Sequence, residues 1–178
     1  MKKPFGVLLL IGALLLLYFA YLNPASSPTS NSKSPTSNFS PDPSNAIFTF
    51  DDGPVTLSNG KNEKTEFGFV EETALLEDMA YGDLNEDDKL DTAVLLVRSG
   101  GASGVFVYAA AYVSGPVGYR GSNAVFLGDR ISPQSISISN NIVTVRYLDR
   151  SEDEPFSAEP TVSASKQFIF RNGEFEER

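Results

Sequence analysis

Residues 83–97 read Asp-Leu-Asn-Glu-Asp-Asp-Lys-Leu-Asp-Thr-Ala-Val-Leu-Leu-Val, a polar loop that runs directly into an apolar segment. Side chains with oxygen atoms stand at the first, third, fifth and ninth positions of this loop. Calcium-binding loops place their ligands at such alternate positions. The apolar run that follows has no polar face, which is typical of a strand buried on both sides. The stretch therefore predicts a calcium loop that leads into a core strand.

Four side chains and one backbone carbonyl form the predicted calcium site: Asp83, Asn85, Asp87, Asp91 and the carbonyl of Lys89. A helix–loop–helix site would also need a bidentate Glu at position twelve, which is Val94 here, so we exclude an EF-hand. Position six requires a positive φ, which Gly adopts most easily, and Asp88 at this position weakens the predicted site. The same residues also fit a solvated acidic turn without an ion, because Asp and Asn favour loops.

The first 45 residues predict an anchor and a tether. The apolar run Phe5–Leu22 follows Lys2 and Lys3, and its eighteen residues can just span a bilayer core. No small-residue cleavage site follows cleanly, so residues 1–22 predict an uncleaved signal anchor with the N-terminus in the cytoplasm and the rest outside. Secretion after cleavage is the alternative. Residues 23–45 are almost entirely Ser, Pro, Thr and Asn, which predicts a disordered linker.

Residues 46–178 have the length of one domain, which is enough to bury a core without disulfides. The chain carries a formal net charge of −9, so we exclude nucleic acid as a partner of the domain. It contains no cysteine and no histidine. Lipid anchors on cysteine, cysteine nucleophiles, serine–histidine–aspartate catalysis and zinc–imidazole sites are therefore excluded.

Three dipeptides predict tight hairpin turns: Asn59-Gly60, Asn140-Asn141 and Asn172-Gly173. The register around the second turn pairs Ile138 with Val143. The next pair on that face is Ile136 with Val145, so the face is apolar. The pairs around the third turn are Arg171 with Glu174 and Phe170 with Phe175, which are also complementary.

Further strands are expected at 47–50, 55–57, 93–97, 105–113 and 124–127. The third and fourth are apolar on both faces and joined by a glycine-rich loop, which predicts a central antiparallel pair. Residues 71–79 are the stretch that fits a short helix. We therefore predict a mainly β fold: an antiparallel sandwich or a partly open barrel of about 8–10 strands, with at most one short helix, behind an N-terminal transmembrane helix.

Two catalytic motifs occur without the partners that they need. Residues 49–54, Thr-Phe-Asp-Asp-Gly-Pro, resemble the first motif of polysaccharide deacetylases, which also use two histidines to hold their metal. Without histidine, we interpret them as a strand and a turn. The Ser-x-x-Lys pattern of serine–lysine acyltransferases occurs at 30–33 in the linker and at 163–166 on an expected strand. Residues three apart on a strand point to opposite faces, so Lys166 cannot activate Ser163.

Two other ways to build a site remain open. Any two carboxylates at a suitable separation could cleave a glycan, although the sequence nominates no pair. Four tyrosines and four arginines could line a groove for a glycan or a peptide, although packing in the core and at its rim is their commoner role. These residues are Tyr108, Tyr112, Tyr119, Tyr147, Arg120, Arg130, Arg146 and Arg150.

Three further segments are Gly-Asp-Leu-Asn-Glu-Asp at 82–87, Gly-Gly-Ala-Ser-Gly at 100–104 and Leu-Gly-Asp-Arg at 127–130. Together they resemble an uncharacterised extracytoplasmic domain family of bacterial envelope proteins. The resemblance covers nearly all of residues 55–166 and implies one secreted β-rich domain without an assigned activity.

We therefore expect a membrane-tethered extracytoplasmic binding or structural module of the bacterial envelope. One calcium ion would brace its fold, and an envelope glycan or protein would be its partner. A cell-wall or glycan hydrolase that uses only carboxylates is the alternative.

Overall fold

The computed structural model describes residues 40–66, 68–100, 104–155 and 157–178. The predicted signal anchor, residues 23–39 of the predicted linker and the Ser-x-x-Lys pattern at 30–33 lie outside these ranges. Within them, no helix is long and apolar enough to cross a membrane. Residues 40–45, which we assigned to the linker, contact the domain, and the carbonyl of Pro41 accepts a hydrogen bond from the Thr92 hydroxyl at 3.0 Å.

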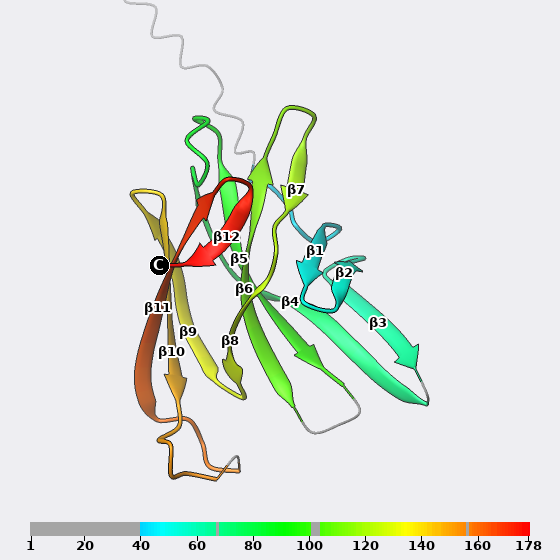
Figure 1. Ribbon diagram of the computed structural model, residues 1–178, viewed down its shortest axis with the longest axis vertical. Helices are drawn as coiled ribbons and strands as arrows, with labels where there is room; N and C mark the ends of the chain where they lie inside the picture. The colour runs from blue at the N-terminus through cyan, green and yellow to red at the C-terminus, as the bar shows by residue number, and fades with distance from the viewer. Residues whose placement is uncertain (1–39, 67, 101–103, 156) are drawn as a thin grey trace, which may run out of the picture. The chain divides into compact units, whose positions relative to one another are not determined.

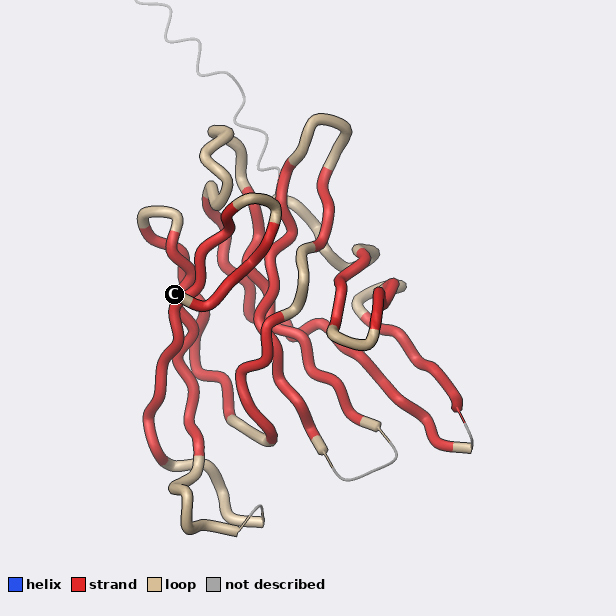
Figure 2. The backbone as a smooth tube through the Cα atoms, in the orientation of Figure 1, coloured by secondary structure: helices blue, strands red, loops and turns tan. Residues whose placement is uncertain are grey.

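The described chain consists of antiparallel strands and their connections, without a helix in those ranges (Figures 1 and 2). The strands are β1 (Ile47–Phe50), β2 (Gly53–Thr56), β3 (Lys61–Glu66), β4 (Phe69–Gly82), β5 (Asp91–Ser99), β6 (Val105–Ser114), β7 (Tyr119–Gly121), β8 (Val125–Asp129), β9 (Ser132–Ser139), β10 (Ile142–Asp149), β11 (Val162–Arg171) and β12 (Glu174–Glu177). The predicted mainly β class is confirmed. The expected number of strands is too low, because β3, β4 and β7 carry polar or short sequences that hide a strand pattern.

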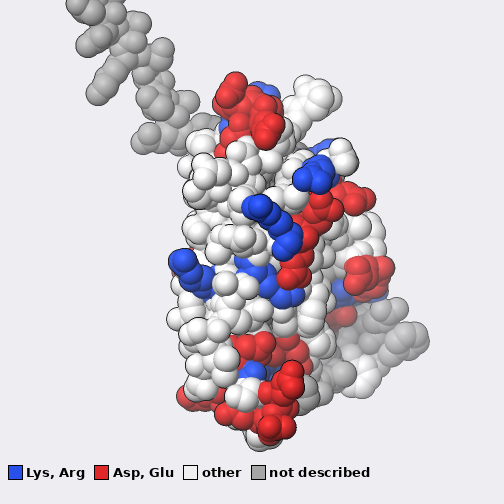
Figure 3. Space-filling view, turned by 60° about the vertical axis from the view of Figure 1, so that its left-hand side comes forward, with Lys and Arg blue, Asp and Glu red and all other residues white. Residues whose placement is uncertain are grey.

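Two larger sheets curl toward each other like half of a barrel (Figure 1). One has the order β12-β11-β10-β9, and the other has the order β3-β4-β5-β6-β7, with β8 also paired to β6. The β1–β2 hairpin forms a separate small sheet that packs on the outer face of the larger one. On the face in Figure 3, acidic side chains gather at the top and bottom, and in the middle Lys and Arg lie beside further acidic side chains.

Strand β5 lies at the centre of the core. Its first six residues, 91–96, are all buried, and it pairs with β6 from Thr92 to Ser99, as the predicted central pair requires. Ala93 and Leu95 belong to the cluster between the two sheets. Val94 and Leu96 belong to a second cluster under the β1–β2 hairpin. Burial on both faces explains why this segment has no polar alternation.

The predicted hairpin turns are confirmed by backbone angles and register. Asn140 and Asn141 have φ of 51° and 62°, and the ladder pairs Val143 with Ile138 and Val145 with Ile136. At the last turn, Asn172 and Gly173 have φ of 53° and 89°, and Phe170 pairs with Phe175. Asn59-Gly60 also turns the chain with positive φ, but in the described residues the backbone pairing of its two arms is limited to the bridge between Ser58 and Lys61.

Residues 71–79 form part of strand β4, not the short helix that we considered. Leu75 pairs with Leu96, and Met79 pairs with Val94, so a span of four positions on β4 faces a span of two on β5. The apolar residues Leu75, Leu76 and Met79 have a spacing that is typical of a helix. The bulge lets a strand bury them instead, with Leu76 packed against one core cluster and Leu75 and Met79 against the other. The two flanking strands fix the extended conformation, because β4 pairs with both β3 and β5.

Candidate functional site

The loop at residues 83–91 wraps around the carboxylate of its first residue. Oδ1 of Asp83 accepts hydrogen bonds from the N–H groups of residues 85, 86 and 87 at 3.2, 2.7 and 3.2 Å, and Oδ2 accepts one from residue 88 at 2.9 Å. Glu86 and Asp88 have φ of 63° and 61°, which confirms the positive φ expected at position six. An acidic side chain at the start of the loop therefore satisfies its backbone donors.

The last residue of the loop ties it to the end of strand β6. Asp91 is fully buried. Its Oδ2 accepts the N–H of Leu84 at 2.8 Å, and its Oδ1 accepts the N–H of Ser114 at 2.8 Å. Each of these hydrogen bonds satisfies a buried backbone N–H group, so removal of the Asp91 carboxylate should lower the stability of the domain.

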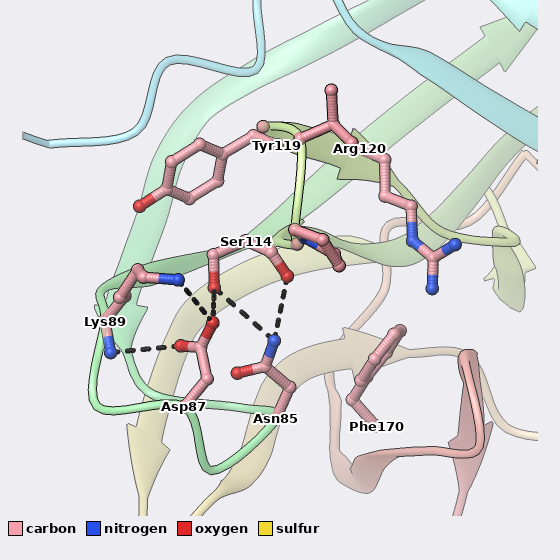
Figure 4. Close-up of a pocket in the computed structure, with 11 residues that line it drawn as sticks. Asn85, Asp87, Lys89, Ser114, Tyr119, Arg120 and Phe170 are labelled. Atoms are coloured by element: carbon pink, nitrogen blue, oxygen red, sulfur yellow. Dashed lines mark hydrogen bonds and ion pairs between the residues drawn. The ribbon is translucent and has the colours of Figure 1, made fainter.

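Ser114 also holds the middle of the loop. Its hydroxyl donates to Oδ2 of Asp87 at 2.6 Å, and its carbonyl accepts from Nδ2 of Asn85 at 2.9 Å. The ammonium of Lys89 lies 3.1 Å from the same Asp87 oxygen (Figure 4). The hydrogen bond from Ser114 lowers the pKa of Asp87 below its usual value, with a further contribution from Lys89.

The five predicted calcium ligands divide into two groups. Asp83 and Asp91 point into the loop and bind backbone N–H groups, whereas Asn85, Asp87 and Lys89 line a groove beside it. Across the described ranges, no three acidic side chains are placed to hold a metal together. In this arrangement the carboxylates do not share one point, so an ion would have to displace some of their hydrogen bonds. Calcium at this loop stays a prediction.

The groove beside the loop is a hollow of about 910 Å³ (Figure 4). The 83–91 loop and the β6–β7 turn, which both line it, lie at the same end of the domain (Figure 1). Its remaining walls are the turn and strand from Ser114 to Arg120 and the side chain of Phe170 from β11. Arg120 pairs with Val113, whose side chain is buried between the two sheets, so Arg120 also points to the inner side. A second hollow of about 410 Å³ adjoins the groove and shares Asn85 and Phe170 with it.

Two of the eight Tyr and Arg residues considered from the sequence, Tyr119 and Arg120, line this groove. The hydroxyl of Tyr119 donates to the carbonyl of Leu90 at 2.9 Å, and its ring stacks on Tyr112 at 5.4 Å. Tyr147, in contrast, is buried in the core.

The other arginines of that set have different positions. Arg150 donates to backbone carbonyls of Ala158 and Arg130, and Arg130 pairs with Asp129. Ser114 and Phe170 were not predicted as site residues. The pairing of Phe170 with Phe175 could have suggested its inner position, but no sequence pattern marks Ser114.

A second polar cluster lies at the turn of the deacetylase-like motif. Arg98 donates to both oxygens of Asp52 at 2.7 and 2.6 Å and to Glu71 at 2.8 Å, and it lies 5.2 Å from the centre of the Phe50 ring. The hydrogen bond from Arg98 lowers the pKa of Asp52. The two acids therefore meet at a guanidinium and bind the β1–β2 turn to the larger sheet. Asp52 of the deacetylase-like motif therefore forms a structural ion pair with Arg98.

The two residues of the second Ser-x-x-Lys pattern both lie on β11, where a separation of three positions turns Ser163 and Lys166 to opposite faces, as expected. Lys166 pairs with Glu177 at 2.9 Å. Comparison of the chain with protein-family models, with curated proteins and with solved structures gives no match. The function is therefore argued from the residues of this chain alone.

Proposed function

We propose that this chain is a membrane-tethered extracytoplasmic binding or structural module of the bacterial envelope. The observation that supports a binding role is the groove between the 83–91 loop, the β6–β7 turn and Phe170. Its volume suits a small ligand or the end of a chain, and its walls combine apolar surface with a few polar groups. The tether and the extracytoplasmic location rest on the predicted anchor and linker and on the resemblance to envelope domains.

A calcium ion at the 83–91 loop is a separate part of the proposal. It is supported by the crowding of acidic residues and by Oδ1 of Asn85, which is buried and accepts no hydrogen bond from the described residues. With a dissociation constant of about 0.1 mM and about 1 mM calcium, binding would add about 1.4 kcal/mol of stability. The ion would brace the loop and would not act as a switch.

The alternative, a hydrolase that uses only carboxylates, has less support. Such an enzyme needs one acid whose pKa is raised so that it can donate a proton. The two acids that approach each other at the second cluster, Asp52 and Glu71, share one guanidinium, and Arg98 lowers the pKa of Asp52. A carboxylate held ionised in this way is a poor proton donor at neutral pH.

The proposal can be tested in intact cells that express the full-length chain. A photo-crosslinking residue at Val117, which is fully exposed at the tip of the β6–β7 turn, should form adducts with an envelope component. The same residue at Ser137, on an exposed position of β9, should form fewer adducts. Equal labelling from both positions would contradict a binding role for the groove.

The hydrolase alternative needs its own assay. The full-length chain, purified in mild detergent, should release no soluble fragments from isolated cell walls. Release of fragments that is abolished by Asp52→Asn would favour the hydrolase. Release that is unaffected by Asp52→Asn would point to other carboxylates and would also contradict the proposed module.

A further inference from the structure

Arg120 differs from the other charged side chains of the groove. Asp87 and Lys89 form an ion pair at 3.1 Å, so their charges offset each other. Arg120 is exposed, and its side chain forms no hydrogen bond or ion pair with any residue of the described ranges. The groove therefore keeps one positive charge, although the chain as a whole carries −9.

The guanidinium of Arg120 extends from strand β7 of the larger sheet toward the β11–β12 turn of the other sheet. The pairing of Arg120 with Val113 directs its side chain inward from the larger sheet. It reaches the turn between β11 and β12, where a Cβ built on Gly173 would stand 3.5 Å from Nη2. Phe170 of the opposite sheet lies on the same side of the groove (Figure 4). A ligand in the groove would therefore meet a cation and an aromatic ring together.

The rest of the groove is mainly apolar on the side of the β6–β7 turn. Pro116 and Val117 line it, and the side chain of Val117 is fully exposed. Exposed apolar surface in a hollow is a common feature of binding sites. An isolated guanidinium beside apolar walls fits a ligand with one anionic group and an apolar body.

Charge also limits the number of anionic groups. The loop that forms the opposite wall places Asp87 in the groove and Glu86 in the adjoining hollow, and among the described residues Lys89 forms an ion pair only with Asp87. A polyanion would be repelled by this wall, whereas a single carboxylate can reach Arg120. A carboxylate also matches the planar fork of a guanidinium and can accept two parallel hydrogen bonds.

We infer that the groove binds a ligand with one carboxylate and an apolar body, and that Arg120 is the residue that binds the carboxylate. The inference rests on the proposed binding function and adds the chemical class of the ligand. Two sources share this chemistry: the free C-terminus of a peptide that ends in an apolar residue, and a small aliphatic acid.

Titration of the full-length chain in a non-ionic detergent tests the inference with three probes, followed by nuclear magnetic resonance. The probes are acetyl-Ala-Ala-Leu with a free carboxylate, the C-terminal amide of the same peptide, and octanoate. At least one free acid should bind, and the amide should bind more weakly than the acid. Binding of the peptide acid alone would identify a C-terminus as the source, and binding of octanoate alone would identify a small aliphatic acid.

Three variants then assign the contacts. Arg120→Gln should weaken the binding of the acid about 10- to 100-fold, because a charge-assisted pair of hydrogen bonds is lost. Phe170→Ala should weaken it about 10-fold through lost apolar contact. Arg146→Gln, a charge change on an exposed position of β10, should leave affinity unchanged. Circular dichroism should show the same fold for all three.

Two results would overturn the inference: no binding of either acid to the wild type, or equal affinity of the wild type and Arg120→Gln. If Val117 still forms adducts with an envelope component, the proposed binding function survives and only the ligand class is wrong. If, in addition, crosslinkers at Val117 and Ser137 form adducts equally, both the proposed binding function and the ligand class are wrong.

Discussion

Asn123 and Phe175 are joined by two hydrogen bonds between a side chain and a backbone. Nδ2 of Asn123 donates to the carbonyl of Phe175 at 2.8 Å, and the N–H of Phe175 donates to Oδ1 of Asn123 at 2.8 Å. An amide side chain thus takes the place of a neighbouring strand for β12, which pairs with β11 on its other side. This contact links the two sheets at the edge where the half-barrel would otherwise be open.

Asn123→Ala should destabilise the domain by about 1–3 kcal/mol, because it leaves the N–H and the carbonyl of Phe175 without partners. Urea unfolding gives the stability, and hydrogen exchange at the Phe175 amide should become faster. Asn62→Ala is the matched control, since Asn62 is half-buried and its amide makes one solvent-exposed hydrogen bond, to the carbonyl of Thr56. If Asn123→Ala loses no more stability than Asn62→Ala, the hydrogen bonds between Asn123 and Phe175 do not hold the two sheets together.

Asp91→Asn should destabilise the domain by about 1–3 kcal/mol. The carboxylate accepts two backbone N–H groups, whereas an amide offers one oxygen and one competing donor, so a buried donor loses its partner. Asp88→Asn is the control, because Asp88 is exposed and Asn tolerates its positive φ. Chemical denaturation measures both variants, and equal stabilities would refute the structural role of Asp91.

Stability should fall in acid through the pair of Asp52 and Arg98. Arg98 lowers the pKa of Asp52 below its ordinary value of 3.8 in the folded state. A carboxyl with a lowered folded pKa stabilises the fold above the unfolded pKa, and this contribution is lost as the pH falls through the folded pKa. The stability difference between the wild type and Asp52→Asn should therefore be constant above about pH 5 and shrink below pH 3.8.

Urea unfolding at several pH values measures this difference. Asp51→Asn is a suitable control, since Asp51 is exposed and its side chain forms no hydrogen bond or ion pair with the described residues, so this substitution should leave stability at neutral pH close to that of the wild type. A difference for Asp52→Asn that persists unchanged to about pH 2.5 would contradict the ion pair.

Gly121→Ala should destabilise the domain by about 1–3 kcal/mol through overpacking. A Cβ at this position would stand 2.1 Å from the carbonyl oxygen of Ile47, and a backbone atom cannot move aside cheaply. Gly100→Ala is the control, because its nearest neighbour would be the flexible side chain of Glu71 at 3.3 Å. Thermal unfolding compares the two, and similar midpoints would show that β1 can shift away from β7.

Local sequence patterns predicted much of the fold. Asn140-Asn141 and the alternation around it fixed the register of Val143 with Ile138, because turn geometry and face polarity agree there. The groove could not be predicted in the same way. Arg120 and Phe170 are fifty positions apart, and they face one hollow only because two sheets curl together.

The role of the acidic loop was also ambiguous in the sequence. Oxygen atoms at alternate positions suit a cation, but the carboxylate of Asp83 equally suits the backbone N–H groups of a tight turn. The spacing of side chains is the same in both cases. The hydrogen bonds from the backbone N–H groups of residues 85–88 to the Asp83 carboxylate could therefore not be predicted from that spacing.

The calcium hypothesis makes the last prediction. The thermal midpoint of the full-length chain in about 1 mM calcium should exceed that in chelator by about 5 °C, which corresponds to about 1.4 kcal/mol for a domain of this size. Asn85→Ala should abolish this difference, because it removes the buried oxygen that accepts no hydrogen bond from the described residues. Asp88→Gly should keep or enlarge it, since Gly adopts the required φ without strain. Magnesium should have less effect, because it demands a tighter octahedral shell. Equal midpoints of the wild type in calcium and chelator would leave the loop as a hydrogen-bonded acidic turn.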